Sequence, residues 1–274
     1  SYDTRTVAVP PEEADAAMDD LLSAGVGLFV ILAQAEDLTR LTDRASEDGA
    51  LVFNAAAPDM GLRQEGCRAN LLHVAPSRAM LADAVVQFAG WKKWDRLYMV
   101  HGSNPSDLAL AEAYRRAVAK FGLTLVGEQV FEDTGGSRRT DSGTTQVQRQ
   151  LPVDLQDAPG HDVLIAADAS DVFAPYLTYH QWTPRAVMGS AGLRPVSFNP
   201  ALEAWGATQF QRRFEELASR YVREEDYATW LALRVIGETV TRTGAADPDT
   251  VRDYVLSDAF ELAAFKGQSV KKSS

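Results

Sequence analysis

The sequence is poor in residues that form covalent cross-links, metal sites and catalytic centres. Its 274 residues include a single cysteine, Cys67, and the four histidines show no metal-ligand spacing. One cysteine excludes an intramolecular disulfide and a cysteine-based zinc cage. Common catalytic signatures are also missing, among them the Gly-x-Ser-x-Gly elbow, the P-loop and the His-Glu-x-x-His helix. We therefore predict that the protein is not an enzyme and holds no catalytic cofactor or metal.

Basic residues are outnumbered, and long apolar runs are lacking. There are 27 lysines and arginines against 38 aspartates and glutamates, which gives a formal net charge of −11. Such a negative field repels nucleic acid and anionic lipid. The longest apolar run, residues 25–33, is far shorter than the roughly 20 residues of a membrane-spanning helix. We predict no nucleic-acid partner and no membrane-embedded segment.

The chain does contain a repeated switch between two hydrophobic periods. Short continuous apolar runs, typical of strands buried on both faces, occur at residues 28–31, 50–53, 97–100, 123–131, 163–166 and 186–188. Amphipathic helical stretches lie between them, and some begin with a proline, as at residues 10–11 and 104–105. After residue 188 the pattern is mainly helical. This alternation predicts an α/β fold with parallel sheets flanked by helices.

Small and polar residues follow the predicted strands at residues 54–57, 101–104, 167–170 and 189–192. Ligands of open parallel sheets bind beyond the carboxyl ends of the strands, where loops and helix N-termini offer free N–H groups. These clusters therefore favour a ligand cleft, although helix capping alone also explains them. Asp168, directly after a strand, fits a helix cap or a ligand contact better than a general base.

The least ordinary segment is residues 133–143, which contains three glycines and the adjacent pair Arg138 and Arg139. Paired guanidinium groups can bind the carboxylates of a ligand in a bidentate manner. A solvated loop is the alternative. Trp182 and Trp205 are candidates for stacking on a planar ligand, whereas tryptophans at the ends of elements also serve as packing at the edge of a core.

Several segments resemble a known family. They are Ala-Pro-Ser-Arg-Ala-Met at 75–80, Trp-Lys-Lys-Trp-Asp-Arg-Leu-Tyr-Met-Val at 91–100, and the proline-capped helix that ends in Lys-Phe-Gly at 120–122. These segments are similar to the middle of type I periplasmic solute-binding proteins, the branched-chain amino-acid type that serves ABC transporters. Residues 131–143 and 260–267 resemble a narrower branch, which is associated with alcohol oxidation dependent on pyrroloquinoline quinone (PQQ) and includes a periplasmic PQQ binder.

The resemblance implies two α/β lobes with the ligand enclosed in a cleft between them. Lobe I would contain residues 1–95 and 190–274, and lobe II residues 96–189. The family pattern and the polar loops together single out ligand-binding positions in both lobes. These are Asn54, Ala55, Ala56, His73, Ser77, Arg78, His101, Gly102, Ser103, Arg138, Arg139, Asp168, Trp182, Ser190 and Ala191.

The chain departs from the family pattern in its ends and in one loop. It begins after the place of the family's first strand and helix and stops before the closing strands, so we expect the N-terminal part of lobe I to be missing. It also has no acid at Ser190 and Ala191, where amino-acid binders commonly keep a carboxylate for the ligand ammonium. This difference favours an anionic, planar ligand over an amino acid.

The resulting hypothesis is a periplasmic protein that captures PQQ as its ligand, for uptake or for delivery to PQQ-dependent dehydrogenases. Arg138, Arg139 and Arg78 would pair with the carboxylates of PQQ, and Trp182 would cover a ring face. The alternatives are an ABC-transporter binding protein for an amino acid or another small carboxylate, and a sensor on the same fold that does not serve transport. The expected partners are this small molecule and an ABC permease.

Overall fold

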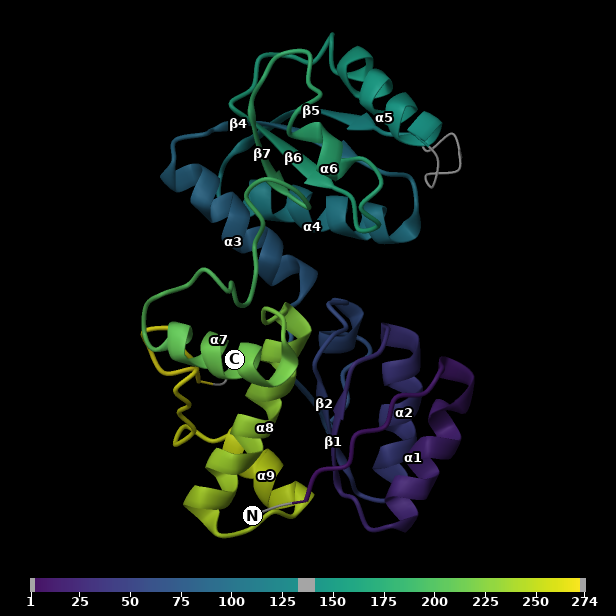
Figure 1. Cartoon of the computed structure of the whole chain (residues 1–274), viewed down its shortest axis with the longest axis vertical. Helices are drawn as coiled ribbons and strands as arrows, with labels where there is room; N and C mark the ends of the chain where they lie inside the picture. Colours follow the sequence, from purple (N-terminus) through teal and green to yellow (C-terminus); the bar gives the residue numbers. More distant parts are fainter. Residues whose placement is uncertain (1–2, 133–140, 272–274) are drawn as a thin grey trace. The chain divides into compact units, whose positions relative to one another are not determined.

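A computed structural model describes residues 3–132 and 141–271 of the chain. The chain divides into two compact units, of which unit 1 is Ser1–Ser77 with Ser197–Ser274 and unit 2 is Arg78–Val196. Each unit is built around its own parallel sheet, seen in Figure 1 as two separate groups of strands. The predicted α/β fold with parallel sheets flanked by helices is confirmed.

The sheet of unit 1 has three parallel strands in the order β1-β2-β3. Its strands are β1 (Leu28–Ile31), β2 (Leu51–Asn54) and β3 (Leu71–His73). All four residues of β2 are buried, because helices cover both faces of this central strand. A strand buried on both faces has no polar face, which is why its sequence is a continuous apolar run.

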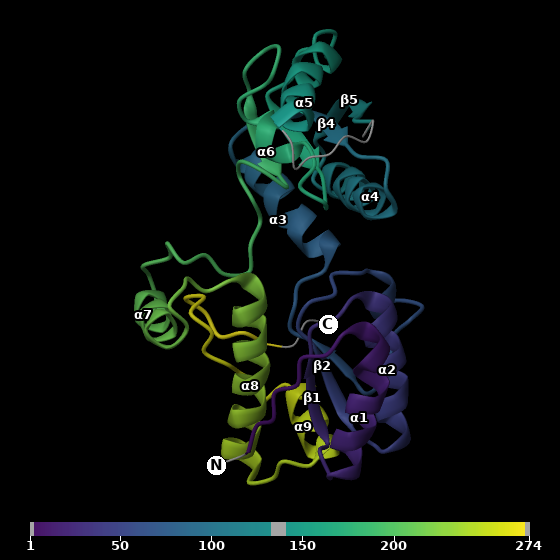
Figure 2. The same ribbon diagram turned by 45° about the vertical axis from the view of Figure 1, so that its right-hand side comes forward.

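The two faces of this sheet pack on different helices. Val52 joins the core formed with α1 (Ala14–Ser23) and α2 (Ala35–Glu47). Leu51 and Phe53 point the other way, into the core formed with α8 (Glu224–Thr243) and α9 (Pro248–Val255). Figure 2 shows the two helix pairs on opposite sides of the strands. The remaining helix, α7 (Ala207–Ala218), buries only Ala207 and Gln211.

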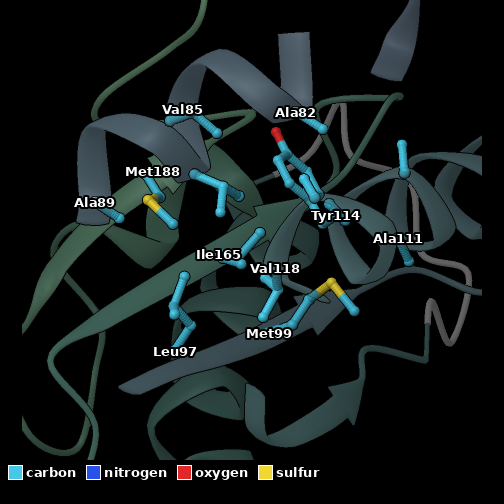
Figure 3. Packing of buried hydrophobic residues seen from close by; sticks show 14 of the residues in the cluster. Ala82, Val85, Ala89, Leu97, Met99, Ala111, Tyr114, Val118, Ile165 and Met188 are labelled. Atoms are coloured by element: carbon cyan, nitrogen blue, oxygen red, sulfur yellow. The ribbon is translucent and has the colours of Figure 1, made fainter. Parts of the chain in front are cut away.

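The sheet of unit 2 has four parallel strands in the order β5-β4-β6-β7. Its strands are β4 (Arg96–His101), β5 (Thr124–Val130), β6 (Val163–Ala167) and β7 (Ala186–Gly189). One face packs on α3 (Arg78–Trp91) and α4 (Pro105–Lys120), and the other on α5 (Asp141–Asp154) and α6 (Ala174–Leu177). Figure 3 shows the first of these cores, with Met99 and Ile165 of the sheet beneath Tyr114 of α4.

The boundaries between the units differ from those expected for the lobes. Helix α3 was assigned to lobe I, but its buried residues Ala82, Val85 and Ala89 belong to the core of unit 2. Residues 190–196 also remain with unit 2, because the Leu193 N–H donates to the Val187 carbonyl and so ties this segment to β7. A helix belongs to the unit on whose core its side chains pack. The hydrophobic period of α3 predicts a buried face but does not show which sheet that face covers.

Two helix starts follow directly from the sequence. The Asn104 side chain accepts a hydrogen bond from the Asp107 N–H, and Pro105 occupies the first position of α4. Asp247 caps α9 in the same way, through the Thr250 N–H, with Pro248 in the first position. Both are stable starts because the cap satisfies a free N–H and proline has none to lose. Within the described residues, no helix is long and apolar enough to cross a membrane.

Candidate functional site

In unit 1 the structure brings two of the predicted residues together. Asn54 ends β2 and His73 ends β3, and the two occupy paired positions in the parallel register. The Asn54 Nδ2 atom lies 3.0 Å from His73 Nδ1. Because the amide nitrogen can only donate, Nδ1 of His73 is the acceptor, and its proton is therefore on Nε2.

Asn54 organises the loop that follows β2. Its Oδ1 accepts hydrogen bonds from the N–H groups of Ala56 and Ala57, at 3.1 and 2.8 Å, and its Nδ2 donates to the Ala57 carbonyl at 2.7 Å. The Asn54 side chain is fully buried, and so is that of Ala55. The amide of Asn54 therefore acts by shaping the loop backbone, which leaves the partly exposed Ala56 as the candidate for direct ligand contact.

His73 is neutral at physiological pH. Burial, together with the nearby charge of Arg63, lowers the pKa of His73 from 6.5 to about 4, and a backbone hydrogen bond with Leu62 opposes this shift. The Leu62 carbonyl is the acceptor available to Nε2–H, since Nδ1 already accepts from Asn54. The imidazole thus connects the end of β2 to the short 3-10 helix η2 (Gly61–Arg63).

Arg63 is a functional candidate that sequence analysis missed. Its Nη2 donates to the carbonyl of Ala75, at 2.6 Å, just after β3. Its Nη1 is shielded from solvent and has no hydrogen-bond partner in the described part of the chain. Burial lowers the pKa of this guanidinium. The sequence feature that could have indicated Arg63 is its place directly after the apolar Leu62, in the loop between β2 and β3.

In unit 2, His101 faces the sheet edge and not an open loop. It is buried at the end of β4, with Nδ1 2.8 Å from the Gly102 carbonyl and Nε2 3.5 Å from Oε2 of Glu128 on β5. Glu128 also forms a bidentate pair with Arg115, at 2.8 and 2.6 Å, which holds the pKa of Glu128 below its usual value. Both imidazole nitrogens therefore face oxygen acceptors of unit 2, and a neutral ring can donate to one of them.

Gly102 is required by the packing of a buried carboxylate. A Cβ at this position would lie 1.9 Å from Oδ2 of Asp107. The Asp107 Oδ1 accepts from the Ala169 N–H at 2.6 Å, and this bond ties the loop after β4 to the loop after β6. Burial raises the pKa of Asp107. Ser103, next to Gly102, is exposed at the same loop.

Asp168 has the contacts of a helix cap. Its Oδ2 accepts from the N–H groups of Phe173 and Ala174, at 2.7 and 2.8 Å, at the start of α6, and Oδ1 accepts from Ser170 at 3.3 Å. The hydroxyl of Ser190 accepts from the Asp168 N–H at 3.0 Å, so these two predicted residues do meet. These three bonds hold the carboxylate against its own loop. Binding of a ligand by Asp168 stays a prediction.

Trp182 lies at the other end of the unit 2 sheet. Its side chain is 61% exposed in the turn that precedes β7. The Gln181 side chain bonds to Arg185, whose Nε donates to the His161 carbonyl just before β6. These contacts place the turn at the amino ends of β6 and β7, whereas Asp168 and Ser190 follow their carboxyl ends. The structure thus gives no support for Trp182 as a cover for a ligand at the strand-end loops.

The other predicted positions are divided between the units. Ala191 is buried directly after β7. Ser77, also buried, ends unit 1, and the partly buried Arg78 begins α3 in unit 2. Arg138 and Arg139 lie outside the described residues. In the described ranges, no group of three or more histidine, cysteine or acidic side chains could hold a metal ion.

Comparisons with known proteins address the fold and family. A sequence profile described as periplasmic binding protein matches residues 2–146. A branched-chain amino acid ABC transporter periplasmic ligand-binding protein from Burkholderia xenovorans has a TM-score of 0.73 and 16% sequence identity, over 93% of this chain and 71% of that chain.

Two further solved structures are similar in fold. A leucine-, isoleucine-, valine-, threonine- and alanine-binding protein from Brucella ovis has a TM-score of 0.71 and 14% identity, over 96% of this chain and 72% of that one. A solute-binding protein of an ABC transporter from R. palustris, in complex with benzoate, has a TM-score of 0.65 and 11% identity, over 97% and 76%. The comparison with curated proteins gave no match.

Proposed function

The chain belongs to the periplasmic binding protein family, and on that premise we propose that it captures a small carboxylate in the periplasm for an ABC transporter. The observation that carries the proposal is the set of loops at the carboxyl ends of the parallel strands. Unit 1 has Asn54 and His73 there, and unit 2 has Asp168 and Ser190. Open parallel sheets bind their ligands at these ends.

A carboxylate without an ammonium group fits these loops best. An amino acid needs an acid that faces its ammonium, and the three bonds that the Asp168 carboxylate accepts from its own loop orient it towards the start of α6. Ser190 and Ala191 supply no acid either. Among proteins of similar fold, one is named for binding leucine and other amino acids and another was solved with benzoate. Aromatic carboxylates are therefore our first choice and amino acids our second.

The more specific hypothesis of PQQ as the ligand has less support. It rests on Arg138 and Arg139, which lie outside the described residues, and the names of the three similar structures mention no quinone. The comparisons favour the alternative of an amino acid or small carboxylate. PQQ carries carboxylates of its own, so it belongs in the same ligand panel. Delivery to dehydrogenases, the partner permease and a sensor role remain predictions.

Ligand binding is tested by titration of purified protein that has been unfolded and refolded to remove carried-over ligand. The panel contains benzoate, leucine and PQQ, with benzamide and leucinamide as uncharged or cationic controls. Calorimetry measures affinity and stoichiometry, and tryptophan fluorescence provides a second signal. We expect saturable one-to-one binding of at least one carboxylate and no saturable binding of its amide. Absence of saturable binding across all three carboxylates would contradict the proposed function.

A further inference from the structure

The guanidinium group of Arg63 is placed as an anion-binding group at the strand ends of unit 1. One of its terminal nitrogens, Nη2, is fixed by the Ala75 carbonyl at 2.6 Å. The other, Nη1, is buried and has no hydrogen-bond partner within residues 3–132 and 141–271. An unsatisfied buried donor on a charged group is costly, so a fold rarely keeps one without a reason.

A chain of hydrogen bonds holds Arg63 in this position. Asn54 Nδ2 donates to His73 Nδ1 at 3.0 Å, and the ring of His73 is bonded in turn to the backbone of Leu62. Leu62 is itself buried and anchors the 3-10 helix whose last residue is Arg63. The tight turn behind it is closed by the Gly66 N–H, which donates to the Gly61 carbonyl at 2.8 Å. The guanidinium therefore sits on a braced segment.

Among the described residues, no acid forms an ion pair with Arg63 or raises its pKa. Burial is the one cause of its lowered pKa, with no carboxylate raising it. His73 beside it is neutral, with a pKa of about 4. Arg68, five positions along the same loop, differs because its Nε and Nη2 pair with both carboxylate oxygens of Asp43. One loop thus carries one arginine used in an ion pair and one arginine left without a counter-charge.

We propose that Arg63 binds the carboxylate of the ligand, and that Asn54 and His73 are the positioning residues that hold it. This inference rests on the proposed function, since it supplies that function's recognition group in unit 1. The carboxylate provides the acceptor that Nη1 lacks, while Nη2 stays bonded to Ala75. Because Nη1 is shielded, we expect the atoms that cover it to move aside when the ligand binds, while the braced segment that carries Arg63 stays in place.

The geometry makes arginine and lysine unequal at this position. Two nitrogens of one planar group serve the Ala75 carbonyl and the ligand at the same time. A lysine ammonium is a point charge on a flexible stem and cannot hold both acceptors in the fixed directions of a guanidinium. The variant Arg63→Lys should therefore bind the carboxylate more weakly than the native protein even though the charge is kept.

The test compares Arg63→Met with Arg68→Met, a matched loss of an arginine from the same loop. The probes are benzoate, leucine and PQQ, each titrated by calorimetry against native protein and both variants. Loss of a charge-assisted hydrogen bond to the ligand should weaken binding of the carboxylate by about 10- to 100-fold in Arg63→Met. Arg68→Met breaks the pair with Asp43 and the bond from Nη1 to the Gly66 carbonyl but leaves the bond from Arg63 to Ala75 in place, so its affinity should stay within about twofold of native.

Stability without ligand separates a binding role from a structural role. Arg63→Met removes a buried charge, which favours the fold, but also the bond from Nη2 to the Ala75 carbonyl, which disfavours it. The urea midpoint of this variant without ligand should therefore stay close to that of the native protein. The same variant should lose the increase in midpoint that the carboxylate gives the native protein. A lower midpoint without ligand, combined with an intact increase on adding ligand, would make Arg63 a structural residue and overturn the inference.

The outcomes distinguish this inference from the proposed function. If native protein binds none of the three carboxylates, the proposed function fails and the inference fails with it. If native protein binds one of them and Arg63→Met binds it equally well, the function stands and only the role of Arg63 is overturned. A selective loss of carboxylate binding in His73→Gln, with the fold retained by circular dichroism, supports the positioning role.

Discussion

Acidification should weaken unit 1 through His73. The pKa of this histidine is lowered from 6.5 to about 4 in the folded protein, mainly by burial and then by the charge of Arg63. Between these values the unfolded chain binds the proton and the folded chain does not. Stability therefore rises with pH across this window. The contribution of His73 is complete above pH 6.5 and is lost as the pH falls towards 4.

The size of the effect follows from the same two values. At about 1.4 kcal/mol per pKa unit, a fall in the pKa of His73 from 6.5 to about 4 corresponds to at most about 3.5 kcal/mol. The imidazole of His73 is only partly buried, so solvent reduces this limit. We expect the free energy of unfolding of unit 1 to fall by about 1–2 kcal/mol between pH 7 and pH 4.5 on account of His73 alone.

The contribution of His73 is measured by urea unfolding of the native protein and of His73→Gln, each at pH 7 and at pH 4.5. Carboxylates such as Glu128 also titrate in this window, but they are present in both proteins. Their effect therefore cancels when the free energy of unfolding of the variant is subtracted from that of the native protein. A fluorinated tryptophan at Trp230, in α8 of unit 1, reports the unfolding of this unit by ¹⁹F NMR. The variant should be less stable at pH 7, and the difference should shrink by about 1–2 kcal/mol at pH 4.5.

Two results would refute this reasoning. In the first, NMR titration of the native protein finds that His73 protonates near pH 6.5, so that burial and Arg63 do not depress its pKa. In the second, the stability difference between native protein and His73→Gln is the same at both pH values. Either result would also remove the neutral imidazole from the network that holds Arg63.

Two further predictions concern unit 2. Gly102→Ala should lower the free energy of unfolding by about 1–3 kcal/mol, because the added Cβ would lie 1.9 Å from Oδ2 of Asp107. Urea unfolding measures this change. An unchanged urea midpoint would mean that the Asp107 carboxylate moves aside without cost. Ile165→Ala, at a fully buried position of β6 in the core formed with α3 and α4, should cost about 2–5 kcal/mol. Val153 is 58% exposed, so Val153→Ala serves as the control for Ile165→Ala and should change the free energy of unfolding by less than about 0.5 kcal/mol. Equal losses in the two variants would contradict the burial of Ile165 in the core.

The sequence alone was sufficient for the fold class and for most of the secondary structure, although the short strand β3 was not predicted. Continuous apolar runs predicted β2 and β4 because central strands of parallel sheets have no solvent face. Asparagine–proline and aspartate–proline pairs predicted the starts of α4 and α9. Apolar runs and cap–proline pairs involve residues within a few positions of each other, so they can be recognised in the sequence without knowledge of the tertiary structure.

The assignment of each helix to one of the two units could be predicted only in part. The apolar stripe of α3 predicted a helix, but Ala82 and Val85 alone do not say which sheet they cover. The helix joined unit 2 because its small residues pack closely on α4 and the nearby strands. The role of Asp168 was undetermined for the same reason. The sequence was compatible with a helix cap and with a ligand contact, and only the structure shows that its carboxylate accepts from the N–H groups of Phe173 and Ala174.

The chemistry of the strand ends was decided by tertiary structure. The sequence by itself determined that polar loops follow the strands, and with them Asn54; His73 was predicted from the family resemblance. Only the folded chain brings these two within 3.0 Å, lowers the pKa of the imidazole to about 4, and leaves Arg63 beside it without a counter-charge. Burial and charge pairing are properties of neighbours in space, and residues 54, 63 and 73 become neighbours only when the parallel strands pair.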